Sequence, residues 1–230
     1  MNSATLQRLC DDREHNRPVA LATRMPDGLQ ALVYSDFTMG ELDLSHDQID
    51  AARSLLDSNR SGWVEEDLLF VRSYCPPLRL LIIGAVHITQ HLVPMAQQAG
   101  FQVTVIDPRR AFASEDRFGG IDYRSEWPDV VLREMALDRH TAVVTLTHDP
   151  KIDDPALHEA LRSTVFYIGS LGSRRTHAQR VGRLREAGFG DVVERIHAPV
   201  GLNLGGRSPA EIAVAVLAEI IQVYHREPDN

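Results

Sequence analysis

The sequence of 230 residues has few cysteines, no long apolar run and no excess of positive charge. Its two cysteines, Cys10 and Cys75, lie far apart and form no CxxC or CxxH pair, which argues against a metal knuckle or redox motif and favours a reducing compartment. No apolar run approaches the roughly 20 residues that cross a bilayer, and the N-terminal residues lack the apolar segment of a secretory signal. We therefore expect a cytoplasmic protein without a membrane span.

The net charge of −8 at pH 7 makes the mean electrostatic field of the protein negative. Such a field repels phosphate, so broad, nonspecific binding to nucleic acid or anionic lipid is not expected. The hydrophobic fraction of 43% and the charged fraction of 24% are ordinary for a soluble globular protein and indicate neither a disordered nor a fibrous chain.

Residues 1–77 are expected to form a small α+β domain that ends at Pro76 and Pro77, because proline cannot donate to a strand ladder. A helix within it begins with a capping box made by Ser45 and Gln48. The expected segments are two strands of a hairpin, this helix, and one or two further strands, at 18–24, 29–35, 45–59 and 62–74.

Residues 78–230 alternate strands with helices, the pattern of a parallel sheet, and predict a Rossmann-like α/β domain. Ligands of such sheets bind beyond the carboxyl ends of the strands, at the point where the strand order reverses. The final helix should begin with Ser208 as cap, Pro209 as first residue and Glu211 completing a capping box. The expected strands lie at 80–83, 102–106, 142–147 and 164–168, and the other helices at 87–99, 155–161 and 174–187.

The loop after the first of these strands departs from the GxGxxG fingerprint of dinucleotide-binding folds. It keeps Gly84, but Val86 and Thr89 stand where the second and third glycines belong. The helix that begins near His87 can still attract an anion to its N-terminus. Val86, however, puts a branched side chain where a pyrophosphate needs bare backbone. The alternative is that Gly84 only makes a tight turn.

Asp107, followed by Arg109 and Arg110, ends the second strand. An acid about twenty residues beyond the first glycine commonly binds ribose hydroxyls, and a neighbouring arginine can accept a 2′-phosphate. The alternative is that Asp107 caps the turn that follows it.

Thr147, His148 and Asp149 end the third strand. A histidine beside a carboxylate can act as an acid or base near neutral pH or can ligate a metal. A histidine pair one helical turn apart is commonly incidental when it lacks a clear third ligand. The further residues considered as metal ligands are Asp153, Asp154 and His158 near this loop, and the pair His87 and His91.

The stretch GSLGSRR follows the fourth strand. It is locally positive, whereas the chain as a whole is negatively charged. Its small residues expose backbone N–H groups, and Arg174 and Arg175 can grip phosphate oxygens in bidentate fashion. We therefore predict an anion site at Gly169, Gly172, Ser173 and these two arginines. The later arginines, Arg180, Arg183 and Arg185, are expected to form a solvated helix face.

The stretch HAPVGL holds His197, Pro199 and Gly201 and precedes a glycine-rich loop and the final helix. We expect this loop to lie beyond the carboxyl ends of the strands, like the loops described above. The N-terminus of the final helix would then point toward the same ligand site as the N-terminus of the helix near His87. The alternative is an ordinary connector.

In this order, the glycine loop with His87, THD, GSRR, HAPVGL and SPAEIA followed by Glu219 resemble the XdhC/CoxI family of maturation factors for xanthine and carbon monoxide dehydrogenases. The resemblance covers roughly residues 75–226. It implies a Rossmann-like C-terminal domain that binds molybdenum cofactor and passes it, in sulfurated form, to a molybdoenzyme of the xanthine or carbon monoxide dehydrogenase type. Such factors are not usually viewed as turning over a metabolite, so the resemblance favours an accessory protein over an enzyme.

The resemblance implies a placement for the cofactor. Its phosphate tail, with or without an attached nucleotide, would lie against residues 172–175 and the helix near His87, and His148, Asp149 and His197 would face the pterin or metal end. A cysteine desulfurase and a second copy of the chain are left open as partners. Two departures stand out: GAVH replaces the common GAGH, and residues 1–77 lack the succession of serine, two glycines and cysteine found in many members.

Two other functions stay open at this point. The first is an oxidoreductase that uses NAD(P), based on the strand–glycine–helix unit and Asp107. The second is a regulatory or scaffolding partner of a dehydrogenase, with a crevice that holds no ligand.

Overall fold

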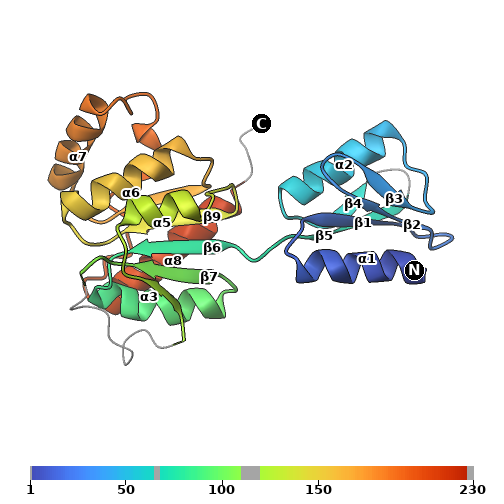
Figure 1. Cartoon of the computed structure of the whole chain (residues 1–230), viewed down its shortest axis with the longest axis horizontal. Coiled ribbons are helices and arrows are strands. Elements are labelled where there is room, and N and C mark those ends of the chain that lie inside the picture. Colours follow the sequence, from blue (N-terminus) through green and yellow to red (C-terminus); the bar gives the residue numbers. More distant parts are fainter. Residues whose placement is uncertain (1, 65–67, 110–119, 227–230) are drawn as a thin grey trace. The chain divides into compact units, whose positions relative to one another are not determined.

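The computed structural model describes residues 2–64, 68–109 and 120–226 of the chain. The chain divides into two compact units, Met1–Pro76 and Pro77–Asn230 (Figure 1). Each unit has its own sheet and its own buried apolar core.

The first unit is a five-stranded antiparallel sheet with a helix on each face (Figure 1). Successive residues of a strand point to opposite faces, so Ala20 and Ala22 pack toward the second helix while Val19 and Leu21 pack toward the first. The first helix and the third strand were not predicted. In sheet order the strands are β3 (Thr38–Gly40), β2 (Gln30–Val33), β1 (Val19–Arg24), β5 (Leu69–Tyr74) and β4 (Gly62–Val64), and the helices are α1 (Ser3–Glu14) and α2 (His46–Asp57).

The second unit is a six-stranded sheet in which every pair is parallel. This confirms the predicted Rossmann-like α/β fold and the small α+β unit before it. In sheet order the strands are β11 (Ile196–His197), β10 (Tyr167–Ser170), β9 (Thr141–Thr145), β6 (Arg79–Ile83), β7 (Gln102–Ile106) and β8 (Asp122–Arg124).

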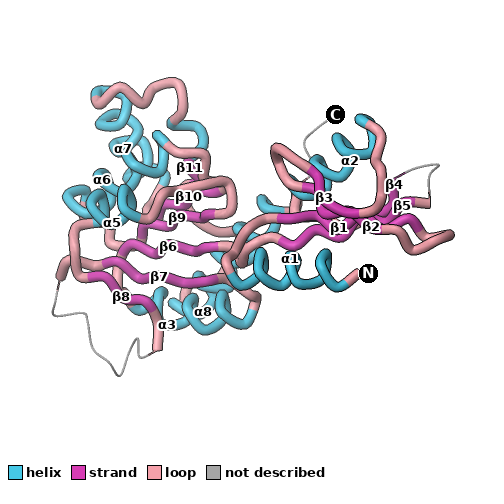
Figure 2. The backbone as a smooth tube through the Cα atoms, turned by 45° about the vertical axis from the view of Figure 1, so that its right-hand side comes forward, coloured by secondary structure: helices cyan, strands magenta, loops and turns pink. Residues whose placement is uncertain are grey.

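Helices cover both faces of this sheet (Figure 2). Leu80 and Ile82 of β6 pack against α3 and α8, whereas Leu81 and Ile83 pack against the opposite layer. No helix in the described ranges is both long enough and apolar enough to cross a membrane. One layer holds α3 (His87–Gln98) and α8 (Pro209–Tyr224), and the other holds α5 (Pro128–Glu134), α6 (Pro150–Arg162) and α7 (Arg174–Glu186), with a short 3₁₀ turn at Val193–Arg195.

Several predicted boundaries of the second unit are confirmed. β7 has the predicted bounds, α3 and α7 end one residue before the predicted position, and α8 begins with the predicted capping box of Ser208 and Glu211.

Three predicted boundaries are wrong. Helix α6 begins at Pro150, five residues before the predicted start at Pro155, because Asp149 caps it and Pro150 already takes the first helical position that suits proline. β9 ends at Thr145 rather than at residue 147, and β10 lies at Tyr167–Ser170 rather than at 164–168. Helix α5 and strands β8 and β11 were not predicted.

The strand order reverses between β6 and β9. From β6 the chain continues to β7 on one side, whereas β9, β10 and β11 extend the sheet on the other. The loops that follow β6 and β9 therefore flank the point where ligands of such sheets bind.

Candidate ligand-binding site

The loops after β6 and β9 touch each other at Gly84 and Thr147. Gly84 has a φ of +115°, and a Cβ atom at this position would lie 2.8 Å from Thr147 Cγ2. Real Cβ atoms do not approach neighbours this closely, so only glycine allows the contact. Gly84 therefore has two roles. It makes the turn after β6, and it lets the loops after β6 and β9 pack together where the strand order reverses.

The turn into α3 explains how Thr89 can replace the third glycine of the fingerprint. Thr89 is buried, and its hydroxyl donates a hydrogen bond to the Gly84 carbonyl, which closes the turn. Val86 is the N-cap residue, makes no side-chain capping bond and packs partly against the core. His87 is exposed at the start of the helix.

Asp107 joins the loop after β7 to the loop after β6. Its Oδ2 accepts hydrogen bonds from the Ala85 amide at 2.8 Å and from Arg109 Nη2 at 2.7 Å, and its Oδ1 accepts from the Arg109 amide and Nε. Burial alone would raise the pKa of this carboxyl, but the bonds from Arg109 and Ala85 outweigh it and hold the pKa below its ordinary value. Both oxygens are engaged within the protein, which favours the capping alternative over ribose binding. Arg110 lies outside the described residues.

The THD loop after β9 leaves one of its three polar side chains exposed. Thr147 Oγ1 donates to Asp153 Oδ1 at 2.7 Å and accepts from the Asp149 amide at 3.0 Å. Asp149 caps α6 by accepting from the Lys151 amide at 3.0 Å. His148 is exposed and holds a φ of +62°, so it is the exposed polar side chain of this loop.

The GSRR stretch forms a capped helix N-terminus. Ser173 accepts from the Thr176 amide at 3.2 Å, and Arg174 and Arg175 are the exposed first residues of α7. Gly169, by contrast, is buried in β10, where an added Cβ would lie 2.6 Å from Val200 Cγ2. Arg174 and Arg175 are therefore exposed at the start of α7, whereas Gly169 has a packing role inside the sheet.

Arg180 corrects the expectation of a solvated arginine face. Its side chain is buried, with 2% of the residue exposed, because it shares the core-facing stripe of α7 with Leu184, four residues later. Arg183 is also engaged, in a bidentate pair with Asp154. Arg185 alone among the three has the expected exposure, at 60% of its side chain. The spacing of Arg180 from Leu184 was a signal of burial in the sequence.

Asp153 lies at the same edge, with 1% of the residue exposed. Its Oδ1 holds the Thr147 hydroxyl, whereas its Oδ2 has no partner among the described residues. Burial raises the pKa of this carboxyl from 3.8 to about 6. The sequence suggested Asp153 only as a metal ligand, so its role as a buried charge was missed.

The HAPVGL loop is fixed by Glu219 of α8. Glu219 Oε2 accepts from the Tyr167 hydroxyl at 2.5 Å and from the Gly201 amide at 2.8 Å, and Oε1 lies 3.4 Å from His197 Nδ1. The rings of Tyr167 and His197 stack with centroids 4.7 Å apart. Pro199, joined to Ala198 by a cis peptide, is exposed. The loop is therefore held in place by side chains of α8 and β10, and it is not a loosely attached connector.

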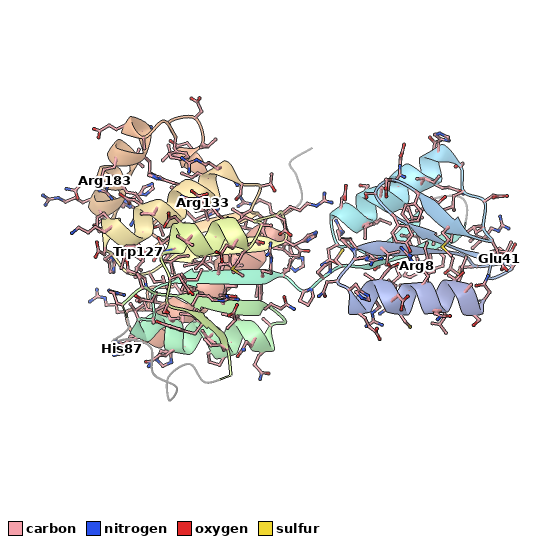
Figure 3. The ribbon with its side chains drawn as sticks, in the orientation of Figure 1. Arg8, Glu41, His87, Trp127, Arg133 and Arg183 are labelled. Carbon is pink, nitrogen blue, oxygen red and sulfur yellow. The ribbon has the colours of Figure 1, made fainter. Side chains whose placement is uncertain are left out.

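The structure brings four of the predicted loops to one edge of the sheet. The links are Gly84 with Thr147, Ala85 with Asp107, and the Leu171 amide after β10 with the Thr145 carbonyl at the end of β9. Figure 3 shows the labelled side chains of His87, Trp127 and Arg183 at the end of the second unit toward which the β6 arrow of Figure 1 points. Within the described ranges, no three histidine, cysteine or acidic side chains group closely enough to hold a metal ion, so the suggested metal ligands are not brought together.

Residues 80–220 match the family model of the XdhC Rossmann domain. This chain belongs to the XdhC family. The match contains the loops after β6, β7, β9 and β10, together with the Glu219 network.

Named relatives of this XdhC-family chain agree with that assignment. It is 33% identical over 160 residues to a Bacillus subtilis protein named as a probable xanthine dehydrogenase subunit, covering 69% of this chain and 46% of the relative. It is 31% identical over 173 residues to the molybdenum cofactor insertion chaperone PaoD of Escherichia coli, covering 74% and 48%. The chain therefore spans less than half the length of these relatives.

A solved structure resembles most of the chain. The crystal structure of a xanthine dehydrogenase from Bacillus halodurans superposes with a TM-score of 0.75 at 25% identity, covering 95% of this chain and 65% of the other. The resemblance therefore extends beyond the residues that match the family model.

The contact between Gly84 and Thr147 predicts an energetic coupling. Gly84→Ala should lower the free energy of unfolding by about 2–4 kcal/mol, through backbone strain and overpacking. In a Thr147→Ser background, which keeps the hydroxyl but removes Cγ2, the loss should shrink by about 0.5–3 kcal/mol. Urea unfolding of the four variants measures the coupling. Gly100→Ala, at a positive φ with open space around its Cβ, should cost the same in both backgrounds, and equal costs for Gly84→Ala would contradict the contact.

The pKa of Asp153 predicts the pH dependence of stability. Because this pKa rises from 3.8 to about 6 on folding, the folded state binds more protons between these values, and the free energy of unfolding falls as pH rises through this window. Asp153→Asn should lack this contribution, which is at most on the order of 3 kcal/mol. Urea unfolding between pH 4 and 7 compares the two proteins. Parallel stability curves would show that the carboxyl titrates normally.

Proposed function

We propose that this XdhC-family chain is a maturation factor that binds molybdenum cofactor and helps to insert it into a molybdoenzyme of the xanthine or carbon monoxide dehydrogenase type. The observation that carries the proposal is the exposed pair Arg174 and Arg175 at a capped helix N-terminus, on the carboxyl edge of the sheet of a chain that has a relative named as a molybdenum cofactor insertion chaperone. The sulfuration of the cofactor, a cysteine desulfurase partner and a second copy of the chain belong to the same proposal.

The residues fit the phosphate end of the cofactor as cargo. Arginine presents several N–H donors in a plane and binds phosphate oxygens in pairs. The N-terminus of α7 adds backbone N–H groups and the positive end of the helix dipole. His87 and His148 are exposed on neighbouring loops, and we assign His148, Asp149 and His197 to the side that faces the pterin. What these residues do is bind and orient the cargo.

The geometry favours this function over NAD(P)-dependent oxidoreduction. A dinucleotide-binding site needs bare backbone at position 86 and an acid free to bind ribose. Here Val86 occupies the first position, and Asp107 uses both oxygens on Ala85 and Arg109.

Replacing both exposed arginines should impair cofactor binding. Arg174→Ala with Arg175→Ala should lower the molybdenum cofactor that copurifies after coexpression with cofactor synthesis by at least about tenfold, since each charge-assisted bond contributes about 1.5–3 kcal/mol. Activation of a partner dehydrogenase should fall in parallel. The matched control is Arg133→Ala with Arg162→Ala. It also removes two positive charges, but from arginines that both pair with Glu159, and it should leave cofactor binding unchanged.

Two outcomes would contradict the proposal. One is that no pterin or molybdenum copurifies with the unmodified chain, and that the Arg174 and Arg175 variant activates the dehydrogenase normally. The other is micromolar binding of NAD or NADP in calorimetry, which would favour the oxidoreductase.

A further inference from the structure

Glu219 places a carboxylate on the side of α8 that packs against the sheet. Val216, one helical turn before it, is fully buried, and the Glu219 side chain is 15% exposed. A carboxylate in such a place is costly unless hydrogen bonds satisfy it. Its Oε2 accepts hydrogen bonds from the Tyr167 hydroxyl and the Gly201 amide, and its Oε1 lies 3.4 Å from His197 Nδ1. Each carboxylate oxygen therefore has a partner, and the partner of Oε1 is a histidine.

The partners of Glu219 keep its carboxyl ionised. Burial alone would raise the pKa of this carboxyl, but the contact with His197 and the bonds from Tyr167 and Gly201 outweigh it and hold the pKa below its ordinary value. An ionised carboxylate has no proton to donate, so the nitrogen that faces it carries one. In a neutral imidazole with its proton on Nδ1, Nε2 is a bare acceptor.

The ring of His197 is fixed in direction and open on its other side. It stacks on the ring of Tyr167, with centroids 4.7 Å apart. Gly169, the register partner of His197, keeps this place clear, because a Cβ atom there would lie 2.7 Å from Tyr167 Cε1. The His197 side chain is 31% exposed, and its Nε2 makes no hydrogen bond within the part of the chain that the structure describes. One nitrogen is thus held by the protein and the other is open to a ligand.

We propose that Glu219 is a positioning residue that presents His197 Nε2 as a hydrogen-bond acceptor to an N–H group of the pterin ring. His197 pairs with Gly169 of the neighbouring strand, three residues before Gly172 in the turn that leads to the exposed arginines. A ligand with its phosphate at the start of α7 and its heterocycle at His197 would span the ends of β10 and β11. This inference rests on the proposed function and names the group of the cargo that His197 recognises.

Amide side chains separate the roles of the two nitrogens of His197. The amide of asparagine reaches the position of Nδ1, and the amide of glutamine reaches that of Nε2. His197→Asn therefore keeps a donor for Glu219 but lacks the outward acceptor, whereas His197→Gln keeps an outward acceptor and loses the contact with Glu219. If His197 only holds the loop in place, His197→Asn is the milder change. If Nε2 binds the cargo, His197→Gln is the milder change.

Glu219→Gln tests the positioning role. The amide oxygen can still accept from Tyr167 and Gly201, but the amide nitrogen then faces His197 and donates to Nδ1. The proton of the neutral imidazole therefore moves to Nε2, which becomes a donor. Glu211→Gln is the matched control, because it makes the same substitution on the same helix at an exposed position of the capping box.

Two measurements on the full chain test the proposal. Nitrogen-15 NMR at about pH 9, where imidazole is neutral, should show the His197 proton on Nδ1 in the unmodified chain and on Nε2 in Glu219→Gln. Cofactor loading is the molybdenum cofactor that copurifies after coexpression with cofactor synthesis. It should fall about tenfold in Glu219→Gln and in His197→Asn, the scale of one lost hydrogen bond, and less in His197→Gln. Glu211→Gln should change neither the proton position nor the loading.

The inference is overturned if the unmodified chain carries the His197 proton on Nε2, if a folded Glu219→Gln variant loads the cofactor normally, or if His197→Asn loads as much cofactor as His197→Gln or more. Should Glu219→Gln fail to fold, the NMR of the unmodified chain and the order of the two His197 variants decide. Normal loading in every Glu219 and His197 variant, while Arg174→Ala with Arg175→Ala loses the cofactor, would remove the inference and leave the proposed function standing. Absence of the cofactor from the unmodified chain would remove both.

Discussion

The close approach of Gly84 to Thr147 is the constraint on which the site depends. It sets the loops after β6 and β9 against each other at the point where the strand order reverses. Asp107 then ties the loop after β7 to the same place through the Ala85 amide. Binding groups held on fixed loops lose little freedom when a ligand arrives, which is the advantage of a site formed in advance.

The distribution of charge around these loops explains how an acidic chain can attract an anion. Arg109 is paired with Asp107, and Arg183 with Asp154, so their charges are balanced within the protein. Arg174 and Arg175 of the GSRR stretch are exposed and form no salt bridge with another described residue, in a chain whose net charge is −8. A local field of this kind can guide an anionic cargo to one edge although the mean field repels it.

The sequence predicted the fold well where a single local cause decides the structure. The apolar run of β7 and the capping box of Ser208 and Glu211 have one interpretation, and both were placed correctly. Helix α6 was placed late because two prolines, Pro150 and Pro155, both suit a first turn, and only the capping bonds of Asp149 choose between them.

The site was predicted less completely because its roles depend on tertiary contacts. The position of Asp107 was evident, but its engagement with Arg109 depends on the direction of two side chains. Arg180 looks like a surface residue by type, and its burial follows from the packing of α7 through the stripe that it shares with Leu184. Glu219 lies 22 residues beyond His197 in the chain, and only the register of β10 with β11 brings Tyr167 to the same network.

A crystal structure of the chain loaded with molybdenum cofactor tests the central claim most directly. The account predicts the terminal phosphate within hydrogen-bond distance of the backbone or side chains of residues 172–175, at the carboxyl edge of the six-stranded sheet. A phosphate bound to the first unit, or at the amino ends of the strands of the second, would contradict it.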